Sequence, residues 1–564
     1  MRVAKFDLRA DGVYILAGDE WEKVCSSLRV VALTRDHESD NWGRLVQWDD
    51  ADGKPHEKII HHSSLAVGNK DVLTQLLAGG LAIEQNKRDS VIEYILSQSP
   101  AQRLTIALHT GWHGHAFVLP DAVIEPDNSS DEIRFAPSVP MGEHGYGVAG
   151  SADDWKREVG ALCRSNSRLT FGISMAFCTP ALEMLGEDGW GAHIHGASST
   201  GKTTVLTASG SVWGGGKNGF LKSWRTTSNA LENVAAAHND CFLPLDELAM
   251  LDAKEADRVP YLLATGKSKA RMNADSSGQR HKEWRLCFLS TGEVTAGQQA
   301  ESVGARTRGG AEARMVNIPA DAGKGMGAFE DLHGRRDAAQ FAVTLREAAL
   351  KFYGAVGREW VRLLITDRVV YTELLRDYIL EFERDHMPQD AAPEVGRVVH
   401  HFAVIAAAGE LATLFDLTGL ELHEAEWACA ECLRAWLESR GGAKAGHDAS
   451  EMLAQVRHFL QSHQADFCRL PENPISGAPR VYRPVGYTRA SDSSPVYFVQ
   501  GEIFKREACK GYDHRQVLAT LELARHLEHD SDRRDKQLEI RPGERARFYA
   551  IRHSLLTNGD NDGE

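Results

Sequence analysis

One short run near the middle of the chain limits what the protein can fold into. It reads Gly196-Ala197-Ser198-Ser199-Thr200-Gly201-Lys202-Thr203-Thr204 and matches the pattern G-x-x-x-x-G-K-[ST]. Apolar residues precede it and helical spacing follows it, as expected of a loop between a strand and a helix. In such a loop backbone N–H groups surround phosphates, the lysine ammonium reaches the outer oxygens and the hydroxyl after it binds Mg²⁺. The run therefore predicts a site for ATP and Mg²⁺.

Two carboxylates follow at the end of a second apolar segment. Residues 241–245 read as a buried strand, and Asp246 and Glu247 come directly after it. Phosphoryl transfer to water needs one group in the metal shell and one that polarises the attacking water. We assign the first role to Asp246, together with Thr203, and the second to Glu247. The alternative is an acidic pair at the start of an exposed helix, where the helix dipole favours negative charge.

A third apolar segment, 284–293, carries the polar residues Ser290 and Thr291 near its end. The pattern is helical from about 151 to 185, and from the phosphate loop to about 319 strand and helix patterns alternate, which indicates an α/β fold with a mainly parallel sheet. The carboxyl ends of such strands meet at one edge of the sheet. Ser290 and Thr291 are therefore candidate sensors of the outer phosphate, although an ordinary strand end before a turn has the same pattern.

The charge balance argues against a general affinity for nucleic acid. The 564 residues carry a formal net charge of −15, whereas a protein that binds through phosphate contacts normally has a basic face. Two basic stretches, 267–285 and 533–552, oppose this average. A charge run is usually a solvated face, so neither stretch alone decides the matter.

Cysteine usage and hydropathy indicate a cytoplasmic protein without a membrane span. The nine cysteines are scattered, and no apolar run approaches the length of about 18 residues that a membrane helix needs. The first residues also lack the apolar stretch of a secretory signal. Cys429 and Cys432 form a C-x-x-C inside a helical pattern without a second pair, so we expect them to pack in the core.

The order of strand, helix and loop patterns divides the chain into five parts. They are a strand-rich α+β domain at 1–125, a linker at 126–150, a P-loop ATPase core at 151–325, a helical lid or bundle at 326–440 and a C-terminal domain at 447–564. The last part reads as helices followed by a basic two-strand wing. This order is typical of a winged helix, which contacts either DNA or proteins.

Taken together, these residues resemble the DUF927 family of mobile-element and phage ATPases. That family is similar to the cassette-chromosome helicases and more distantly to the MCM-like branch of AAA+ proteins. The resemblance covers roughly residues 10–320 and, less specifically, the C-terminal domain. It rests on Gly111-Trp112, 117–120, the phosphate loop, 224–227, 245–247, 284–286 and 289–293. It implies an AAA+-like ATPase ring, as a hexamer, that acts on DNA during replication of a mobile element with initiator or primase partners.

The resemblance also implies a hairpin, placed before the sensor strand, that lines the central channel of the ring. Here it covers 270–284, which makes Arg271, Arg280 and Lys282 candidate DNA contacts. A basic hairpin that only protects a sheet edge is the alternative.

An arginine from a neighbouring subunit usually completes such a site. Arg314 matches best by its position, and Arg308 and Arg306 are rivals. The chain departs from the AAA+ pattern at the sensor strand, where Ser290 and Thr291 replace the common asparagine.

Three functions stay open at this point. The first is an ATP- and Mg²⁺-dependent DNA helicase or translocase. The second is a regulatory ATPase that switches protein partners without unwinding DNA. The third is a scaffold that binds ATP without turnover, against which the intact Lys202, Thr203, Asp246 and Glu247 argue. The basic hairpin favours the first, and the acidic total keeps the second open.

Overall fold

The computed structural model describes most of the chain, and the described residues are 5–66, 70–127, 132–137, 144–215, 219–256, 258–268, 282–303, 313–440, 442, 447–470, 484–489, 495–510, 512–529, 533–541 and 543–557. The chain divides into two units. The first comprises Met1–Val303, Arg314–His386 and Val399–Ala435, and the second comprises Gly304–Ala313, Met387–Val398 and Trp436–Glu564. The predicted ATPase core and most of the predicted helical lid therefore share one unit.

The N-terminal part is built on an antiparallel sheet of three strands and a mixed sheet of five strands. A three-stranded sheet contains β1 (Phe6–Arg9), β2 (Gly12–Ala17) and β3 (Glu20–Cys25). A five-stranded sheet has the order β11-β7-β4-β5-β6, with β4 (Leu28–Arg35), β5 (Gly43–Asp49), β6 (Pro55–His61), β7 (Arg103–Ala107) and β11 (Ile133–Phe135). The helices are α1 (His62–Ala66), α2 (Lys70–Ala78) and α3 (Arg88–Ser97). β11 lies inside the predicted linker, so the sheet continues past residue 125.

A small hairpin sheet follows. It contains β8 (Gly111–His113), β9 (Ala116–Leu119) and β10 (Ala122–Ile124) in the order β10-β9-β8. All seven residues of β8 and β9 are buried, because this sheet packs into the first unit.

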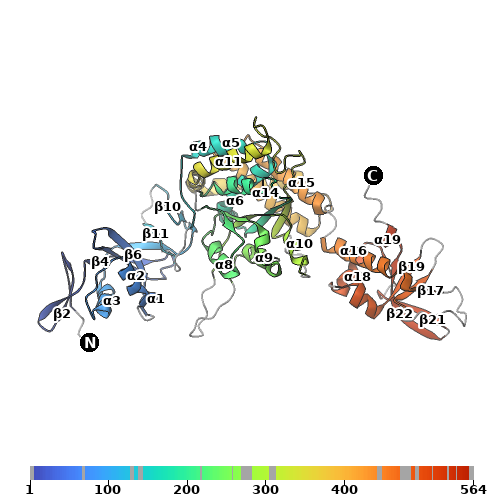
Figure 1. Cartoon of the computed structure of the whole chain (residues 1–564), viewed down its shortest axis with the longest axis horizontal. Helices are drawn as coiled ribbons and strands as arrows, with labels where there is room; N and C mark the ends of the chain where they lie inside the picture. The colour runs from blue at the N-terminus through green and yellow to red at the C-terminus, as the bar shows by residue number, and fades with distance from the viewer. Residues whose placement is uncertain are drawn as a thin grey trace. The chain divides into compact units, whose positions relative to one another are not determined.

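The centre of the first unit is a parallel sheet of five strands in the order β13-β14-β15-β12-β16. The strands are β12 (Trp190–His195), β13 (Lys222–Ser223), β14 (Leu243–Asp246), β15 (Cys287–Gly292) and β16 (Met315–Pro319). Helices cover both faces (Figure 1), and β14 and β15 are accordingly buried along almost their whole length. Around the sheet lie α4 (Ala152–Trp155), the π-helix η1 (Lys156–Gly160), α5 (Ala161–Cys163), α6 (Ser167–Leu185), α7 (Lys202–Gly210), α8 (Ser228–Ala236), η2 (Leu248–Met250), η3 (Ala253–Glu255), α9 (Arg258–Thr265) and α10 (Ala296–Glu301).

Residues 338–440 are helical, as the periodicity predicts. The helices are α11 (Ala338–Lys351), α12 (Ala355–Thr366), α13 (Arg368–His386), α14 (Pro393–Leu414) and α15 (Glu424–Arg440). Within the described residues, α14 is the one helix long and apolar enough to cross a membrane, and 78% of its most apolar stretch is buried inside the protein. Such burial is typical of a core helix. Cys429 and Cys432 lie on α15 and are fully buried, which confirms the packing role expected of them.

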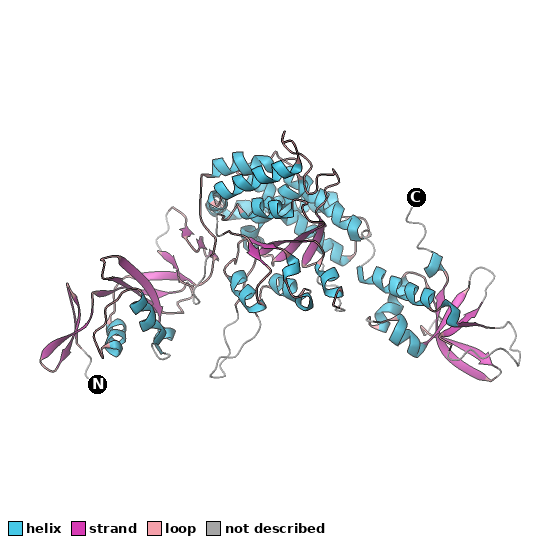
Figure 2. Cartoon of the chain, in the orientation of Figure 1, coloured by secondary structure: helices cyan, strands magenta, loops and turns pink. Residues whose placement is uncertain are grey.

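The second unit contains a six-stranded sheet with helices around it (Figure 2). Its elements are α16 (His447–Ser462), η4 (Gln464–Asp466), β17 (Phe467–Arg469), β18 (Gly486–Arg489), β19 (Val496–Gln500), α17 (Gly501–Ile503), η5 (Phe504–Ala508), α18 (His514–Leu523), β20 (Leu527–Glu528), β21 (Lys536–Arg541), β22 (Glu544–Arg552) and α19 (Ser554–Thr557). The predicted two-strand wing corresponds to the antiparallel pair β21 and β22. The pair belongs to a larger sheet, because β22 also pairs with β19 and β20.

Candidate functional site

The predicted phosphate loop joins β12 to α7 at the carboxyl edge of the parallel sheet. Gly201 directly precedes α7 with φ 92°, and its Cβ, if present, would meet the Phe329 ring at 2.6 Å. Ser199 is also left-handed, with φ 63°. The loop starts beside β15, where the Gly196 N–H donates to the Gly292 carbonyl at 3.2 Å. These turns direct the N-terminus of α7 toward the edge of the sheet, where helix N–H groups favour an anion.

Lys202 lies against the start of this loop. Its side-chain Nζ donates to the carbonyl oxygens of Gly196 at 2.7 Å and Ala197 at 2.6 Å. Burial lowers the pKa of Lys202, and the negative charges of Glu293, Glu247 and Asp246 oppose that shift. The loop cation is therefore influenced by carboxylates at the ends of β14 and β15.

The structure brings four predicted site residues together at the ends of α7, β14 and β15. The Thr203 hydroxyl donates to Asp246 Oδ1 at 3.5 Å, and the Thr291 hydroxyl donates to the same oxygen at 2.5 Å. The Glu247 N–H in turn donates to Thr291 Oγ1 at 3.4 Å. Hydroxyl and carboxylate oxygens are the protein ligands that Mg²⁺ prefers, so Thr203 and Asp246 fit this metal. Among the described residues, no cluster of three or more His, Cys, Asp or Glu side chains could hold a metal.

Glu247 has an unusual backbone conformation. Its φ of 60° and ψ of 78° place it in the left-handed region, although it is not a glycine. Non-glycine residues pay a conformational cost there and persist only where the surroundings impose it, often at functional sites. The turn carries Glu247 out of the line of β14 immediately after Asp246.

Ser290 and Thr291 have different environments, because successive strand residues point to opposite faces. Thr291 contacts Asp246, whereas Ser290 is fully buried. The Ser290 hydroxyl bonds to Trp224 Nε1 and to His193 Nδ1, both at 2.9 Å. Of the two predicted sensors, only Thr291 is thus in contact with the carboxylates. The sequence analysis missed His193 and gave Trp224 no role, although Trp224 lies in one of the motifs of the resemblance.

Arg314 lies at the amino ends of the sheet strands, whereas the phosphate loop lies at their carboxyl ends. It immediately precedes β16, and its carbonyl accepts from the N–H of Gly191 at the start of β12. The loop begins five residues later at Gly196, roughly 15 Å along a strand. The guanidinium lies over the Tyr261 ring, 4.2 Å from its centroid. Arg314 is therefore remote from the loop of its own chain. Arg306 and Arg308 lie outside the described residues.

The base of the predicted channel hairpin is an antiparallel pair. Lys267 bridges Glu283, the Ser268 N–H donates to the Lys282 carbonyl at 2.9 Å, and the Trp284 N–H donates to the Gly266 carbonyl at 2.9 Å. The Lys282 ammonium donates to Asn233 Oδ1 on α8. Arg271 and Arg280, the other predicted DNA contacts, lie outside the described residues.

A buried group that we call the Asp240 anchor joins this hairpin base to β8. Asp240 Oδ2 accepts from the Trp112 N–H at 3.0 Å, and Asp240 Oδ1 accepts from Arg285 Nε at 2.8 Å. Asn239 adds two bonds, donating to the Thr110 carbonyl and accepting from the Arg285 N–H, both at 2.9 Å. These contacts explain the Gly111-Trp112 motif as a docking point on the central sheet.

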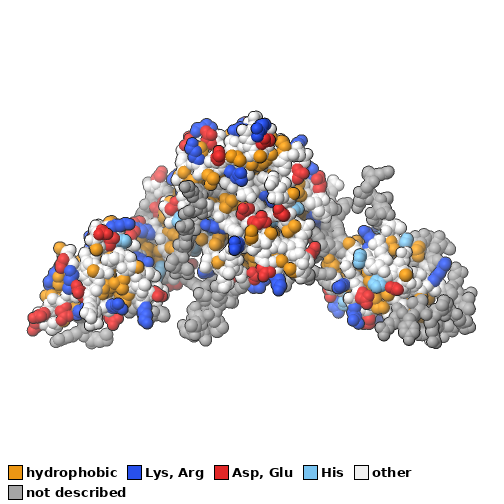
Figure 3. Space-filling model, in the orientation of Figure 1, with side chains coloured by type: hydrophobic (Ala, Val, Ile, Leu, Met, Phe, Trp, Pro, Cys, Tyr) orange, Lys and Arg blue, Asp and Glu red, His pale blue; other side chains and the backbone are white. Residues whose placement is uncertain are grey.

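Many basic side chains of the 533–552 stretch have acidic partners. Arg547 pairs with Asp535 at 2.7 Å, Arg534 with Glu522 at 2.8 Å and Lys536 with Glu528 at 3.0 Å. On the face shown in Figure 3, acidic and basic side chains are interspersed over the described surface. The basic stretch of the sequence is consequently less cationic in the folded domain than its composition indicates.

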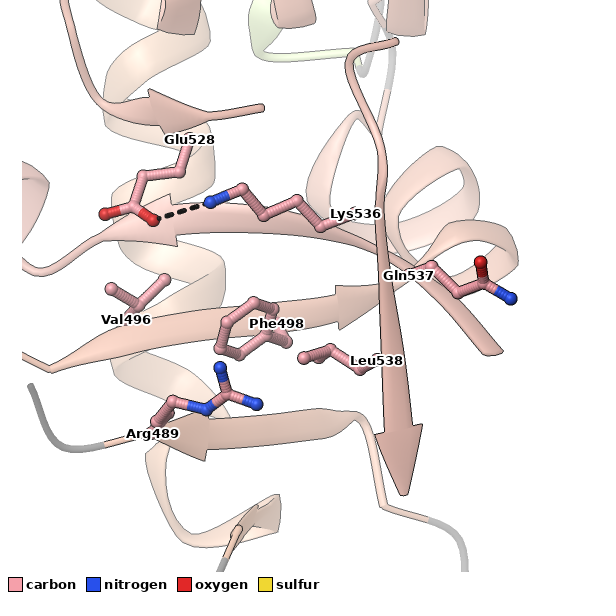
Figure 4. A pocket seen from close by; sticks show the side chains of 7 residues that line it. All are labelled: Arg489, Val496, Phe498, Glu528, Lys536, Gln537 and Leu538. Carbon is pink, nitrogen blue, oxygen red and sulfur yellow. Dashed lines mark hydrogen bonds and ion pairs between the residues drawn. The ribbon is translucent and has the colours of Figure 1, made fainter. Parts of the chain in front are cut away.

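A cavity of about 330 Å³ lies on the sheet of the second unit (Figure 4). Its lining residues are Arg489, Val496, Phe498, Glu528, Lys536, Gln537 and Leu538. The Lys536–Glu528 pair lies on one side, and the Arg489 guanidinium lies 5.5 Å from the Phe498 ring centroid. The charged groups of the cavity thus interact with other residues of the same domain.

Comparisons with known proteins agree with this fold. Residues 6–283 match the family model "Domain of unknown function (DUF927)", a segment that holds the phosphate loop, Asp246 and Glu247. The structure is similar to "SCCmec type IV Cch - active helicase", with a TM-score of 0.70 and 17% sequence identity over 98% of both chains. The chain therefore has the mixed α/β fold of that protein over nearly its whole length.

Two further comparisons add little. NtrX from Brucella abortus in complex with ADP matches with a TM-score of 0.16 and 12% identity, over 40% of this chain and 45% of that chain. That score is too low to indicate a shared overall fold. No curated protein sequence matches the chain.

Proposed function

We propose that the protein is an ATP-dependent DNA helicase or translocase of a mobile genetic element or prophage. One observation carries this proposal: Lys202 and Thr203, in the first turn of α7, lie at the same end of the parallel sheet as Asp246 and Glu247 at the end of β14. This arrangement suits hydrolysis of a nucleoside triphosphate. The shared fold with a structure described as an active helicase supports DNA as the substrate on which the energy is used.

Each site residue has a specific task in the proposed reaction. The loop N–H groups and Lys202 bind the phosphates, and Thr203 and Asp246 would hold Mg²⁺, which would supply positive charge next to the transferring phosphoryl group. Glu247 orients the attacking water and accepts its proton. Thr291 holds Asp246 by its short hydrogen bond.

The strand order and the position of Arg314 support an AAA+-like ring. The loop strand β12 lies between β15 and β16, and β14 lies on the far side of β15. Since Arg314 is remote from its own loop, it suits a site on a neighbouring copy, as a hexameric ring would provide. The proposal places this ring in the cytoplasm, with DNA and replication initiator or primase proteins as partners.

A regulatory ATPase that switches protein partners is the second candidate. The net charge of −15 and the ion pairs of the C-terminal basic stretch favour it. A winged-helix-like second unit serves either candidate, because such domains contact DNA or proteins.

ATP turnover with and without single-stranded DNA, combined with strand displacement on a forked duplex, tests the proposal. We expect turnover that DNA stimulates and displacement that requires ATP. Lys202→Ala should abolish both, because the loop loses the charge directed at the outer phosphates. Turnover in the wild type without displacement would favour the regulatory ATPase, and full turnover in Lys202→Ala would remove the site assignment.

The hairpin separates the two candidates at the level of residues. The double variant Arg280→Ala with Lys282→Ala should keep basal ATP hydrolysis and lose its stimulation by DNA. It should also flatten the salt dependence of DNA binding by about one unit of slope for each lost phosphate contact. Replacing Arg336 and Arg362, whose side chains are 85% and 57% exposed, is the matched control for loss of charge. An unchanged slope in the hairpin variant would count against the channel contact.

A further inference from the structure

A chain of hydrogen bonds lies directly behind the two carboxylates. Trp224 Nε1 donates to Ser290 Oγ at 2.9 Å, Ser290 Oγ lies 2.9 Å from His193 Nδ1, and His193 Nε2 lies 3.0 Å from the Val294 carbonyl oxygen. The side chains of Trp224, Ser290 and His193 are 0% exposed. We call these three residues the Trp224 relay.

The direction of each bond follows from its neighbours. A carbonyl oxygen only accepts, so His193 Nε2 carries the proton that bonds to Val294. Burial lowers the pKa of His193 to about 3, which keeps the ring neutral, and Nδ1 is then an acceptor. The Ser290 hydroxyl must therefore donate to His193, which leaves its lone pairs for the Trp224 N–H. Each polar side-chain atom in the relay has a partner of the correct kind, and the Ser290 hydroxyl has two.

The relay connects the strand ends that form the candidate site. His193 lies on β12, Ser290 lies on β15, and Trp224 follows β13. The Trp224 backbone N–H also donates to the Asp246 carbonyl at 3.2 Å. Ser290 is next to Thr291, the residue that bonds to Asp246 and to the Glu247 N–H.

We infer that the Trp224 relay is a positioning device for hydrolysis, and that Trp224, Ser290 and His193 act through Thr291 on Asp246 and Glu247. This inference rests on the proposed ATPase function. By fixing the end of β15, the relay holds the Thr291 hydroxyl in place, and Thr291 sets the orientation of the metal-binding carboxylate. Residues that orient the ligands of a metal typically change activity by 10- to 100-fold when they are removed.

Two variants test the inference, Trp224→Phe and Ser290→Ala. The first removes one N–H donor and keeps an aromatic ring, and the second removes the central hydroxyl. We expect kcat for ATP to fall at least about tenfold in each. The affinity for a fluorescent ATP analogue, measured by equilibrium titration, should change less than about threefold, because the phosphate loop is not altered. Trp224→Phe supports the same comparison where Ser290→Ala folds poorly.

Trp155→Phe is the matched control. Trp155 Nε1 donates to Ser211 Oγ at 2.8 Å, both residues are almost fully buried, and neither contacts the carboxylates. This variant loses a buried Trp–Ser hydrogen bond of the same kind and should keep the wild-type kcat. Equal kcat values in the control and the relay variants, with equal thermal stability, would overturn the inference. So would a fall in analogue affinity that matches the fall in kcat.

The outcome also separates this inference from the proposed function. Wild-type turnover that Lys202→Ala abolishes would support the ATPase, whatever the relay variants do. With that result in hand, relay variants that match the Trp155→Phe control would overturn the relay alone. A wild-type protein without ATP turnover would overturn both.

Discussion

Glu247 combines a left-handed backbone with the proposed role of activating water. At φ 60° it lies in a region that a non-glycine residue adopts only at a cost. Its N–H is fixed by Thr291, and Asp246 before it is fixed by the same hydroxyl. The conformation therefore depends on the backbone and on Thr291, and the Glu247 carboxylate does not contribute to it.

A variant that changes only this carboxylate should accordingly fold normally. We expect Glu247→Gln to bind ATP like the wild type and to lose at least about 100-fold in kcat, because an amide cannot accept the proton of water. The free energy of unfolding should stay within about 0.5 kcal/mol of the wild-type value. Equilibrium titration, single-turnover hydrolysis and urea unfolding measure the three quantities. Weakened ATP binding with an unchanged catalytic rate would contradict the assigned role.

His400 on α14 is held between two carboxylates. Its Nε2 lies 3.0 Å from Glu187 Oε1, and its Nδ1 lies 2.7 Å from Glu383 Oε1 on α13. The hydrogen bond to Glu187, followed by the bond to Glu383, raises the pKa of His400 to about 9 despite the effect of burial. The imidazolium therefore links α14 to α13 and to Glu187, the second residue after α6, at neutral pH.

This shift predicts a dependence of stability on pH. The folded pKa is above the unfolded value of about 6.5, so protonation stabilises the fold. The contribution is complete below about pH 6.5 and is lost as pH rises through about 9. Allowing for partial solvent exposure, we expect a loss of about 2 kcal/mol across this range. Urea unfolding of the wild type and of His400→Gln measures it. The variant should lack this part of the decline, and equal slopes would refute the assignment.

At the scale of elements, the Asp240 anchor fixes the amino ends of two strands. Asp240 precedes β14 and Arg285 precedes β15, and the other ends of these strands carry Asp246 and Thr291. The same carboxylate receives the Trp112 N–H of β8. The hairpin base, formed by 266–268 and 282–284, ends next to Arg285, so the anchor joins this base, β8 and the two site strands.

Two glycines of one hairpin sheet test this network. Gly111 has φ 92°, and a Cβ there would lie 2.4 Å from Asp240 Oδ2, whereas Gly114 has φ 63° and nothing within 4 Å of its Cβ position. Gly111→Ala should lower the free energy of unfolding by at least about 3 kcal/mol, and Gly114→Ala by about 1 kcal/mol. Urea unfolding of both variants makes the comparison. Equal losses of unfolding free energy in the two variants would show that the positive φ, and not the contact with Asp240, determines the cost at Gly111.

The sequence predicted those elements whose chemistry or periodicity is local. The phosphate loop, the Asp246-Glu247 pair and the strands β4, β5 and β6 all follow from patterns of a few adjacent residues. Short strands such as β11 and β17 were not predicted. Each has only three residues, which is too few to show a periodicity, and each pairs with a segment distant in the sequence. Of the six-stranded sheet in the second unit, the sequence therefore predicted only the β21–β22 hairpin.

The remaining parts of the site depended on tertiary contacts. β15 is buried on both faces, so its sequence cannot indicate that Thr291 and not Ser290 points to Asp246. His193 lies 97 residues from its partner Ser290. The ion pairs of the basic C-terminal stretch depend on Glu522 and Glu528, which the fold brings to it.

At the scale of the whole molecule, the remote position of Arg314 predicts cooperation between copies. A mixture of Arg314→Ala and Lys202→Ala chains should recover part of the ATPase activity that each variant lacks. Some interfaces then pair an intact loop with an intact arginine. Sedimentation should confirm mixed assembly. A mixture as inactive as both parents would count against Arg314 and direct the test to Arg308 and Arg306.

The separation of Arg314 from the phosphate loop along β12 and β16 has a consequence for activity at low protein concentration. If each site needs an arginine from a neighbouring copy, ATP turnover per molecule falls on dilution, because fewer copies are then associated. The distance between the two ends of these strands would thus make ATP hydrolysis depend on assembly, so that little ATP is hydrolysed before the copies have associated.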